Sequence, residues 1–183
     1  MAGLAIWLVL ACAIGLSGVL EKASAPAIAA IVWALTIALV LAGWKAAPVR
    51  DWASNVPLRG LISFHLIRFV GLYFLYLEGR GQMPAPFARP AGWGDVATAL
   101  LATVLLVSGG VKSRGLVLAW NSFGFLDILF VVFCALQIGL RDWSAMHALR
   151  EWPLNLLPTL VVPLVIASHL LIFARVGRST ETG

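Results

Sequence analysis

The sequence predicts an all-α fold, a polytopic transmembrane helical bundle of about six spans, from its composition, its length and its apolar runs. Of its 183 residues, 61% are hydrophobic and only 11% are charged, and the mean hydropathy is +0.96. Such values lie outside the range of soluble domains. Because one span needs about 20 apolar residues, the chain has room for about six helices with short connections. We therefore expect residues 1–183 to form a single transmembrane domain.

Long apolar runs bounded by charged residues, Pro or Gly mark the individual spans. The runs fall at about 3–20, 26–44, 58–77, 95–110, 116–140 and 156–173. The fourth run is the shortest, and Asp95 is expected to be its N-cap. The stretch before it, 78–95, is rich in Gly and Pro, which predicts a loop and not a regular helix.

The first run also resembles a signal peptide, because Ala23-Ser24-Ala25 is similar to a small-residue cleavage site. However, no Lys or Arg precedes this run, and the run is longer than the usual apolar core of a signal peptide. We therefore expect the first span to be retained.

The charged residues predict the orientation of the bundle. One side holds Lys45, Arg50, Arg59, Lys112, Arg114, Arg175 and Arg178, and the other holds Lys22, Arg80, Arg89, Arg141 and Arg150. The acidic residues Glu21, Glu78, Asp95, Asp142 and Glu151 fall on the second side. Since Lys and Arg favour the cytoplasmic side, both termini are predicted to be cytoplasmic. No basic run is dense enough to follow a phosphate backbone, so we expect lipid and no nucleic acid as a partner.

A stripe of small residues in the second span predicts close helix packing. Its members recur at four-residue spacing and are Ala30, Ala34, Ala38 and Ala42. We expect the stripe to face another span of this chain. A homo-oligomer or a larger membrane complex is the alternative, and in that case the protein is a non-catalytic accessory subunit.

Four ionisable residues inside the predicted spans are the strongest candidates for a functional site. Such groups are costly in hydrocarbon and usually face the protein interior or a cavity. They are His65 and Arg68 in the third span, Asp127 in the fifth and His169 in the sixth. At about 1.5 Å per residue along each helix, Arg68 and Asp127 lie at similar depth. This agreement predicts an intramembrane ion pair, with the two histidines nearby in one leaflet.

These residues form one site if the third, fifth and sixth helices are neighbours. His65 and Arg68 share a helix face, and Asn121, Gly124 and Asp127 follow one another along one ridge of the fifth helix. The predicted ligand-binding or proton-coupling site comprises His65, Arg68, Asn121, Asp127 and His169. Asp95 and Ser122 are secondary candidates, although Ser122, five residues from Asp127, points away from it.

Several functions fit such a site. A histidine beside an Arg–Asp pair can couple protonation to helix movement, which favours binding or transport of a small solute or proton. Pro158 and Pro163 interrupt the sixth span, and broken helices often line cavities. A second possibility is a b-type haem with His65 and His169 as its ligands and electron transfer as its function. A third is a cluster that only fixes helix packing.

The sequence contains no motif of a common enzyme class, such as a P-loop, a GxSxG elbow, an HExxH helix or a CxxC pair. A nucleophile paired with a base is not evident either. We therefore assign no catalytic residue and do not expect an enzyme.

Three groups of residues between His65 and His169 carry a resemblance. They are the segment Phe87-Ala88-Arg89-Pro90-Ala91-Gly92-Trp93-Gly94-Asp95, the pair Trp120-Asn121 with Gly124 and Asp127, and Pro163 with His169. In these residues the chain resembles an uncharacterised family of small multi-spanning bacterial integral membrane proteins. That family has no assigned activity, so the resemblance implies no catalytic residue. It implies a bacterial inner (cytoplasmic) membrane as the location and draws attention to Asp95, Asn121 and Asp127.

Overall fold

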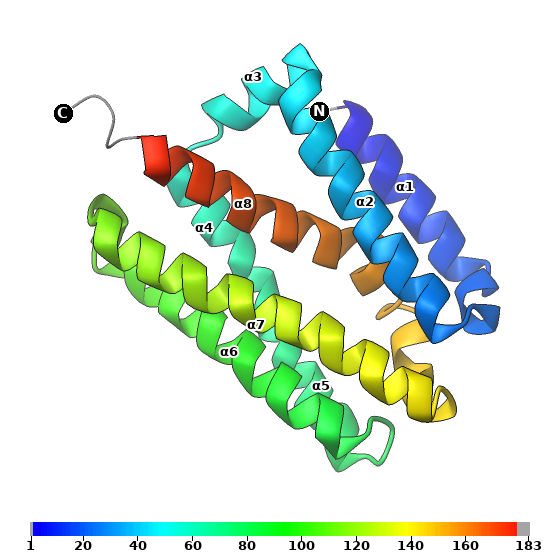
Figure 1. Ribbon diagram of the computed structural model, residues 1–183. Coiled ribbons are helices and arrows are strands. Elements are labelled where there is room, and N and C mark those ends of the chain that lie inside the picture. Colours follow the sequence, from blue (N-terminus) through cyan, green and yellow to red (C-terminus); the bar gives the residue numbers. More distant parts are fainter. Residues whose placement is uncertain (1, 179–183) are drawn as a thin grey trace.

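The computed structural model describes residues 2–178, and the regular elements within that range are helices. The longer ones are α1 (Ala2–Leu16), α2 (Ala25–Lys45), α3 (Ala47–Asn55), α4 (Leu58–Phe64), α5 (Gly71–Gly79), α6 (Ala85–Val107), α7 (Arg114–Arg141) and α8 (Val162–Arg178) (Figure 1). The shorter ones are η1 (Val19–Lys22), η2 (His65–Val70), η3 (Gly110–Lys112), η4 (Ser144–Arg150) and η5 (Leu157–Val161). The predicted all-α helical bundle is confirmed.

Five helices of the described chain are long and apolar enough to cross a membrane, as expected of a multi-pass membrane protein. They are Ala25–Lys45, Leu58–Gly79, Ala85–Val107, Arg114–Arg141 and Leu157–Gly177. The second of these combines α4, η2 and α5, and the last combines η5 with α8. The 15 residues of α1 span about 22 Å at 1.5 Å per residue, less than the ~30 Å of a hydrocarbon core. The described residues thus form five apolar helices of full length and one shorter apolar helix, α1.

The fourth span begins earlier than the sequence predicted, because the Gly- and Pro-rich stretch before Asp95 is largely helical. Helix α6 starts at Ala85, after Pro84 as N-cap, and Pro86 occupies its first turn. A proline there is tolerated because its missing N–H would have no partner within the helix. The predicted loop over 78–95 is therefore confined to residues 80–84, and the assignment of Asp95 as an N-cap was wrong. Asp95 lies in the middle of α6.

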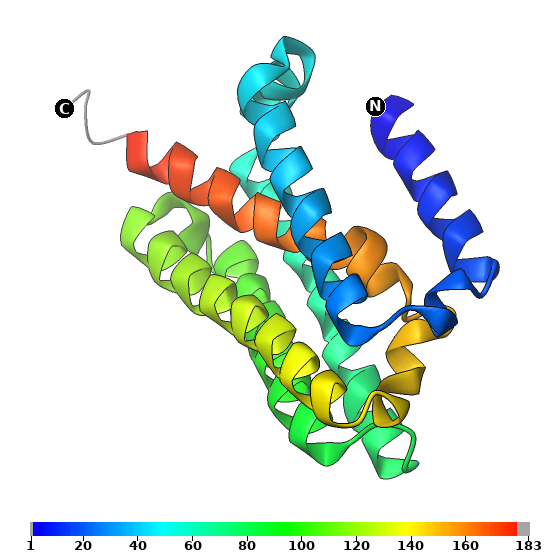
Figure 2. The same ribbon diagram turned by 45° about the vertical axis from the view of Figure 1, so that its right-hand side comes forward.

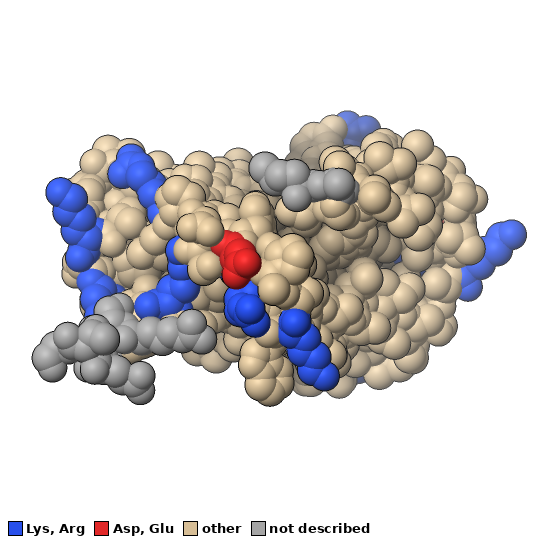
Figure 3. Space-filling model, turned by 90° about the horizontal axis from the view of Figure 1, so that it is seen from above, with Lys and Arg blue, Asp and Glu red and all other residues tan. Residues whose placement is uncertain are grey.

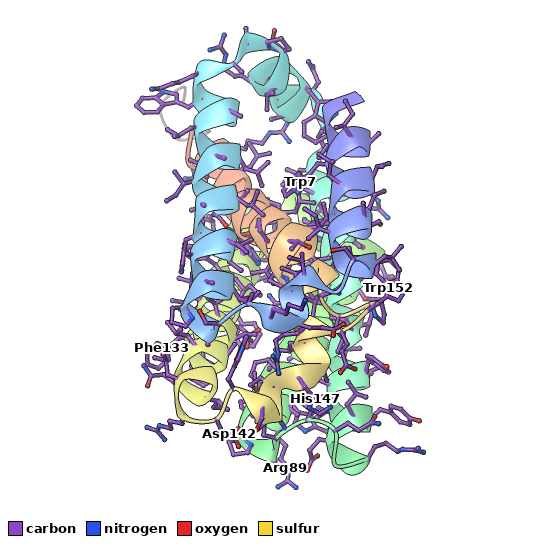
Figure 4. All side chains as sticks on the ribbon, turned by 90° about the vertical axis from the view of Figure 1, so that its right-hand side faces the viewer. Trp7, Arg89, Phe133, Asp142, His147 and Trp152 are labelled. Atoms are coloured by element: carbon purple, nitrogen blue, oxygen red, sulfur yellow. The ribbon has the colours of Figure 1, made fainter. Side chains whose placement is uncertain are left out.

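Helix α8 lies between α2 on one side and the packed helices α5, α6 and α7 on the other (Figure 1). Helix α6 packs against α5, η2 and α7, while α8 crosses obliquely and contacts both α7 and α2 (Figure 1). Helix α1 stands apart from the rest (Figure 2). It is attached at its inner side, where the Trp7 indole donates to Thr159 O at 3.0 Å (Figure 4).

Close contact between α5 and α6 depends on two glycines. A Cβ added to Gly71 would lie 2.4 Å from Gly92 O, and one added to Gly92 would lie 2.9 Å from Gly71 O. Since real Cβ atoms essentially never come so close, any larger residue would separate the two helices. This contact brings the η2 segment directly against the middle of α6.

Charged residues gather at the two ends of the bundle. Arg89, Asp142 and His147 lie at the end where α5 meets α6 (Figure 4). Figure 3 looks onto the opposite end, which carries α3 and where Lys and Arg predominate over Asp and Glu. The prediction that Asp95 belongs to a charged surface was wrong, because this residue is 4% exposed and lies within the bundle.

Candidate functional site

A buried ion-pair cluster at Arg68 joins three helices. The Arg68 side chain is 2% exposed, and its Nε donates to Asp95 Oδ1 at 2.6 Å. Its Nη1 donates to Gly124 O at 2.8 Å, and its Nη2 pairs with Asp127 Oδ2. The predicted Arg68–Asp127 ion pair is thus present, and Asp95 is a second acidic partner that the sequence did not reveal.

All three charged residues lie near the middle of long apolar helices. Arg68 is midway along Leu58–Gly79, Asp95 midway along Ala85–Val107 and Asp127 midway along Arg114–Arg141. At such a depth the hydrocarbon cannot solvate charges, so they must be balanced by protein groups. One guanidinium faces two carboxylates here, which leaves one excess negative charge when both carboxylates are ionised.

The local backbone explains how His65 and Arg68 come to face the same interior. Between α4 and α5 the helix tightens into the 3-10 segment η2. A 3-10 helix has about three residues per turn, so side chains three apart lie directly above one another. His65 and Arg68 are therefore aligned, and both are buried. Such a stretch within a long helix often marks a hinge or a functional position.

The two buried histidines lie against each other beside this cluster. His65 and His169 are both fully buried, with ring centroids 4.1 Å apart. His65 and Trp120 also meet edge to face, with 5.1 Å between their ring centroids. A Cβ added to Gly124 would lie 2.8 Å from His169 Cε1. Gly124 therefore touches the histidine with its α-carbon side while its carbonyl accepts from Arg68, which links the two groups.

The hydrogen bonds of the histidines fix their tautomers. His169 Nδ1 lies 2.8 Å from Asn121 Oδ1. An amide oxygen only accepts, so Nδ1 donates. His65 Nε2 lies 3.1 Å from Ser168 Oγ, whose hydroxyl donates to Val165 O at 2.8 Å. Since the hydroxyl hydrogen is already used, His65 Nε2 is the donor in this bond.

Each ring therefore keeps one nitrogen with a lone pair and no partner. These atoms, His65 Nδ1 and His169 Nε2, are buried and have no hydrogen-bond partner among the described residues. A buried polar atom without a partner costs free energy. Each nitrogen can accept a hydrogen bond from an internal water or ligand, or take up a proton.

The histidine pair does not fit a b-type haem. Two axial imidazoles hold the iron between them, and the planar macrocycle lies in the same space. The rings of His65 and His169 are instead in direct contact, tilted by 41° at 4.1 Å. His65 also has its Nε2 engaged by Ser168. This arrangement of the two rings does not favour a haem-based function.

The structure brings the five predicted site residues together, and the adjacency assumed for their helices is correct. Asn121 on α7 bonds both the ring and the backbone oxygen of His169 on α8. Ser122 is exposed and lies outside the site. The sequence did not predict Asp95 as an ion-pair partner or Ser168 as the partner of His65. Ser168 could have been noticed because it is a polar residue within an apolar span.

A cavity of about 90 Å³ opens beside the cluster. Arg68 and Asp95 are polar members of its lining, and Trp143 and Arg150, which follow the end of α7, also line it. The rest of the lining consists of alkyl and aromatic residues of α2, η2, α5, α6, α7, η4, η5 and α8. Pro158, in the interrupted first turn of the last span, also lines it, in agreement with the predicted role of a broken helix.

Fold and site together define a multi-pass helical membrane protein with a buried charge cluster. The chain belongs to the family described as Domain of unknown function (DUF8737), whose model matches residues 25–176. The matched region begins at α2 and contains the whole cluster and both histidines. This agrees with the resemblance to an uncharacterised family. No curated protein and no solved structure matches the chain.

Proposed function

We propose that this protein binds a proton at the Arg68 cluster and couples it to the movement of a small solute across the bacterial cytoplasmic membrane. The observation that carries this proposal is the imbalance of two carboxylates against one guanidinium in the middle of the spans. An excess charge in hydrocarbon is costly. One bound proton, or one bound monovalent cation, restores neutrality.

Coupling to movement follows from the position of the cluster between three helices. Arg68 belongs to η2, Asp95 to α6 and Asp127 to α7, so the charge of the cluster sets the attraction between these helices. A change of one proton shifts the balance between two packings if they differ in this attraction. The nitrogens His65 Nδ1 and His169 Nε2, which have no partner among the described residues, offer a neighbouring place for a hydrogen bond from a water molecule or a solute.

The charges at the ends of the bundle support an orientation of the protein in the membrane. The described ends of the chain, in α1 and α8, lie toward the same end of the bundle (Figures 1 and 2). Lys and Arg predominate on the end that carries α3 (Figure 3). By the positive-inside tendency, we assign this end and both termini to the cytoplasm. The cavity near Trp143 and Arg150 then belongs to the opposite half of the bundle.

Infrared spectroscopy of the purified protein tests proton binding directly, because a protonated carboxyl group absorbs separately from a carboxylate. We expect a carboxyl band that titrates with pH in the wild type and is lost in Asp95→Asn or Asp127→Asn. The matched control is Asp51→Asn, which changes an exposed residue of α3. A wild type without such a band, or a band unaffected by both cluster variants, would refute the proposal.

A second candidate function, as a subunit of a homo-oligomer or larger complex, is favoured by the alanine stripe of α2. Ala30, Ala34 and Ala38 are exposed, so the expectation that the stripe faces another span of this chain was wrong. Small residues on a lipid-facing surface allow a second helix to approach closely. Light scattering of the solubilised protein tests this role. A smaller assembly for Ala34→Leu supports it, whereas a wild-type monomer argues against self-association.

A further inference from the structure

The cavity beside Arg68 has one polar region and otherwise apolar walls. Asp95 Oδ1 accepts from Arg68 Nε at 2.6 Å, and Asp95 is the one acidic residue among the described residues that line the cavity. Around it lie buried side chains that include Val32, Phe74 and Val131. A carboxylate in an otherwise largely apolar lining favours a ligand with a donor at one end and a hydrocarbon body.

We propose that this cavity binds a small organic cation, a primary alkylammonium ion, with the ammonium group on Asp95 and the alkyl group along the apolar walls. This inference rests on the proposed function and names the solute class for the same site. The ammonium charge would replace the proton that otherwise balances the second carboxylate. Proton and solute would thus compete for one position, as coupled exchange requires.

The lining distinguishes this ligand from an inorganic cation. A metal ion gives up its water only where several oxygen ligands replace it. Here the carboxylate of Asp95 stands among alkyl and aromatic side chains, so most of that coordination would be missing. An alkylammonium ion needs few acceptors, and its hydrocarbon part gains free energy by leaving water.

The volume limits the ligand to a few heavy atoms. The cavity measures about 90 Å³, below the ~150 Å³ of an engineered cavity that holds benzene. Butylammonium is therefore a suitable probe. A second arginine, Arg150, also lines the cavity, but its guanidinium donates to Glu21 O at 2.7 Å and to Trp143 O at 3.2 Å. It also stacks on the Trp143 ring, 4.8 Å from the centroid, so it is held by protein groups.

The test measures the unfolding temperature of the solubilised full chain at fixed pH and ionic strength against increasing butylammonium chloride. Sodium butyrate, of similar size and opposite charge, is the matched ligand control. We expect a saturable rise in Tm with butylammonium and none with butyrate. Asp95→Asn should weaken the apparent affinity about tenfold or more, because it removes a charge-assisted hydrogen bond.

A second variant keeps the proposal testable if Asp95→Asn fails to fold. Ala135 lines the cavity from α7, so Ala135→Leu should fill it and abolish the saturable rise. Ala119→Leu makes the same change at an exposed position of α7 and should leave binding intact. No saturable rise in the wild type, an equal rise with butyrate, or full binding by Ala135→Leu would overturn the inference. If the carboxyl band still titrates in that case, proton binding stands and only the solute class fails.

Discussion

Gly94 lies against the carboxylate of Asp127, so closely that a Cβ added at position 94 would come within 1.9 Å of Asp127 Oδ1. The two residues belong to α6 and α7, and Gly94 directly precedes Asp95. The same turn of α6 therefore supplies one acidic partner of Arg68 and leaves room for the other. This contact makes the size of residue 94 a determinant of the geometry of the cluster.

Gly94→Ala should destabilise the protein by about 1–3 kcal/mol or more, as overpacking does in a tightly packed interior, because Asp127 must move away from Arg68. Gly43→Ala is the control, since Gly43 lies in the last turn of α2 and a Cβ there meets nothing within 4 Å. That change should be neutral or stabilise by up to about 1 kcal/mol. Unfolding in detergent measures both.

A double-variant comparison tests whether Gly94→Ala lowers stability through Asp127. If Gly94→Ala acts by displacing Asp127, its cost should shrink in an Asp127→Ala background, where the carboxylate is absent. Equal costs in both backgrounds would show that the methyl group disturbs something else.

Removing the guanidinium should cost more than removing either carboxylate. Arg68→Met leaves Asp95 and Asp127 without a cation in the bundle, and breaking a buried ion pair costs about 3–5 kcal/mol. Asp127→Asn instead leaves the neutral pair of Arg68 and Asp95, with an amide that can still accept a hydrogen bond, so we expect a loss of about 1 kcal/mol. Denaturant unfolding in mixed micelles measures the stability of both variants. A larger loss of stability for Asp127→Asn than for Arg68→Met would contradict the inference that the cluster holds two carboxylates and one cation.

The ion pair of Arg68 with Asp127 was predictable because depth along a helix follows from residue counting alone. The role of Asp95 was not, because the Gly and Pro residues before it are typical of loops and hid the start of α6. In the structure these glycines allow neighbouring helices to pack closely, because Gly92 contacts Gly71 and Gly94 contacts Asp127. Local propensity was overridden by packing that no single sequence reveals.

The prediction that the alanine stripe of α2 faces another span was wrong for a related reason. Four-residue spacing predicts a helix face suited to close packing, but it does not indicate which neighbour occupies that face. In the structure the buried residues Val32 and Thr36 point inward, and Ala34 and Ala38 point outward. The hydrophobic pattern could not distinguish the faces because all of them are apolar in a membrane helix.

Asn121→Leu should destabilise the protein by about 2 kcal/mol or more. It leaves the Nδ1–H of His169 without its acceptor and removes the donor to the His169 carbonyl, and each unsatisfied buried group costs about 1–3 kcal/mol. The neighbouring Ser122→Ala changes an exposed residue of the same helix and should stay within about 0.5 kcal/mol. Thermal unfolding in detergent compares the two. Similar stabilities would mean that the histidine ring finds another acceptor.

The visible spectrum of the purified protein should be featureless, even from cells with ample haem. His65 and His169 are in ring contact, at 4.1 Å between centroids, and hydrogen bonds to Ser168 and Asn121 hold them there. Opening a slot for a macrocycle would break both bonds and separate η2 from α8. The measurement is absorbance of the oxidised protein, repeated after dithionite. A Soret band that sharpens on reduction, disappears in His65→Ala and persists in His147→Ala, which alters the exposed histidine, would contradict this contact and make the protein an electron carrier.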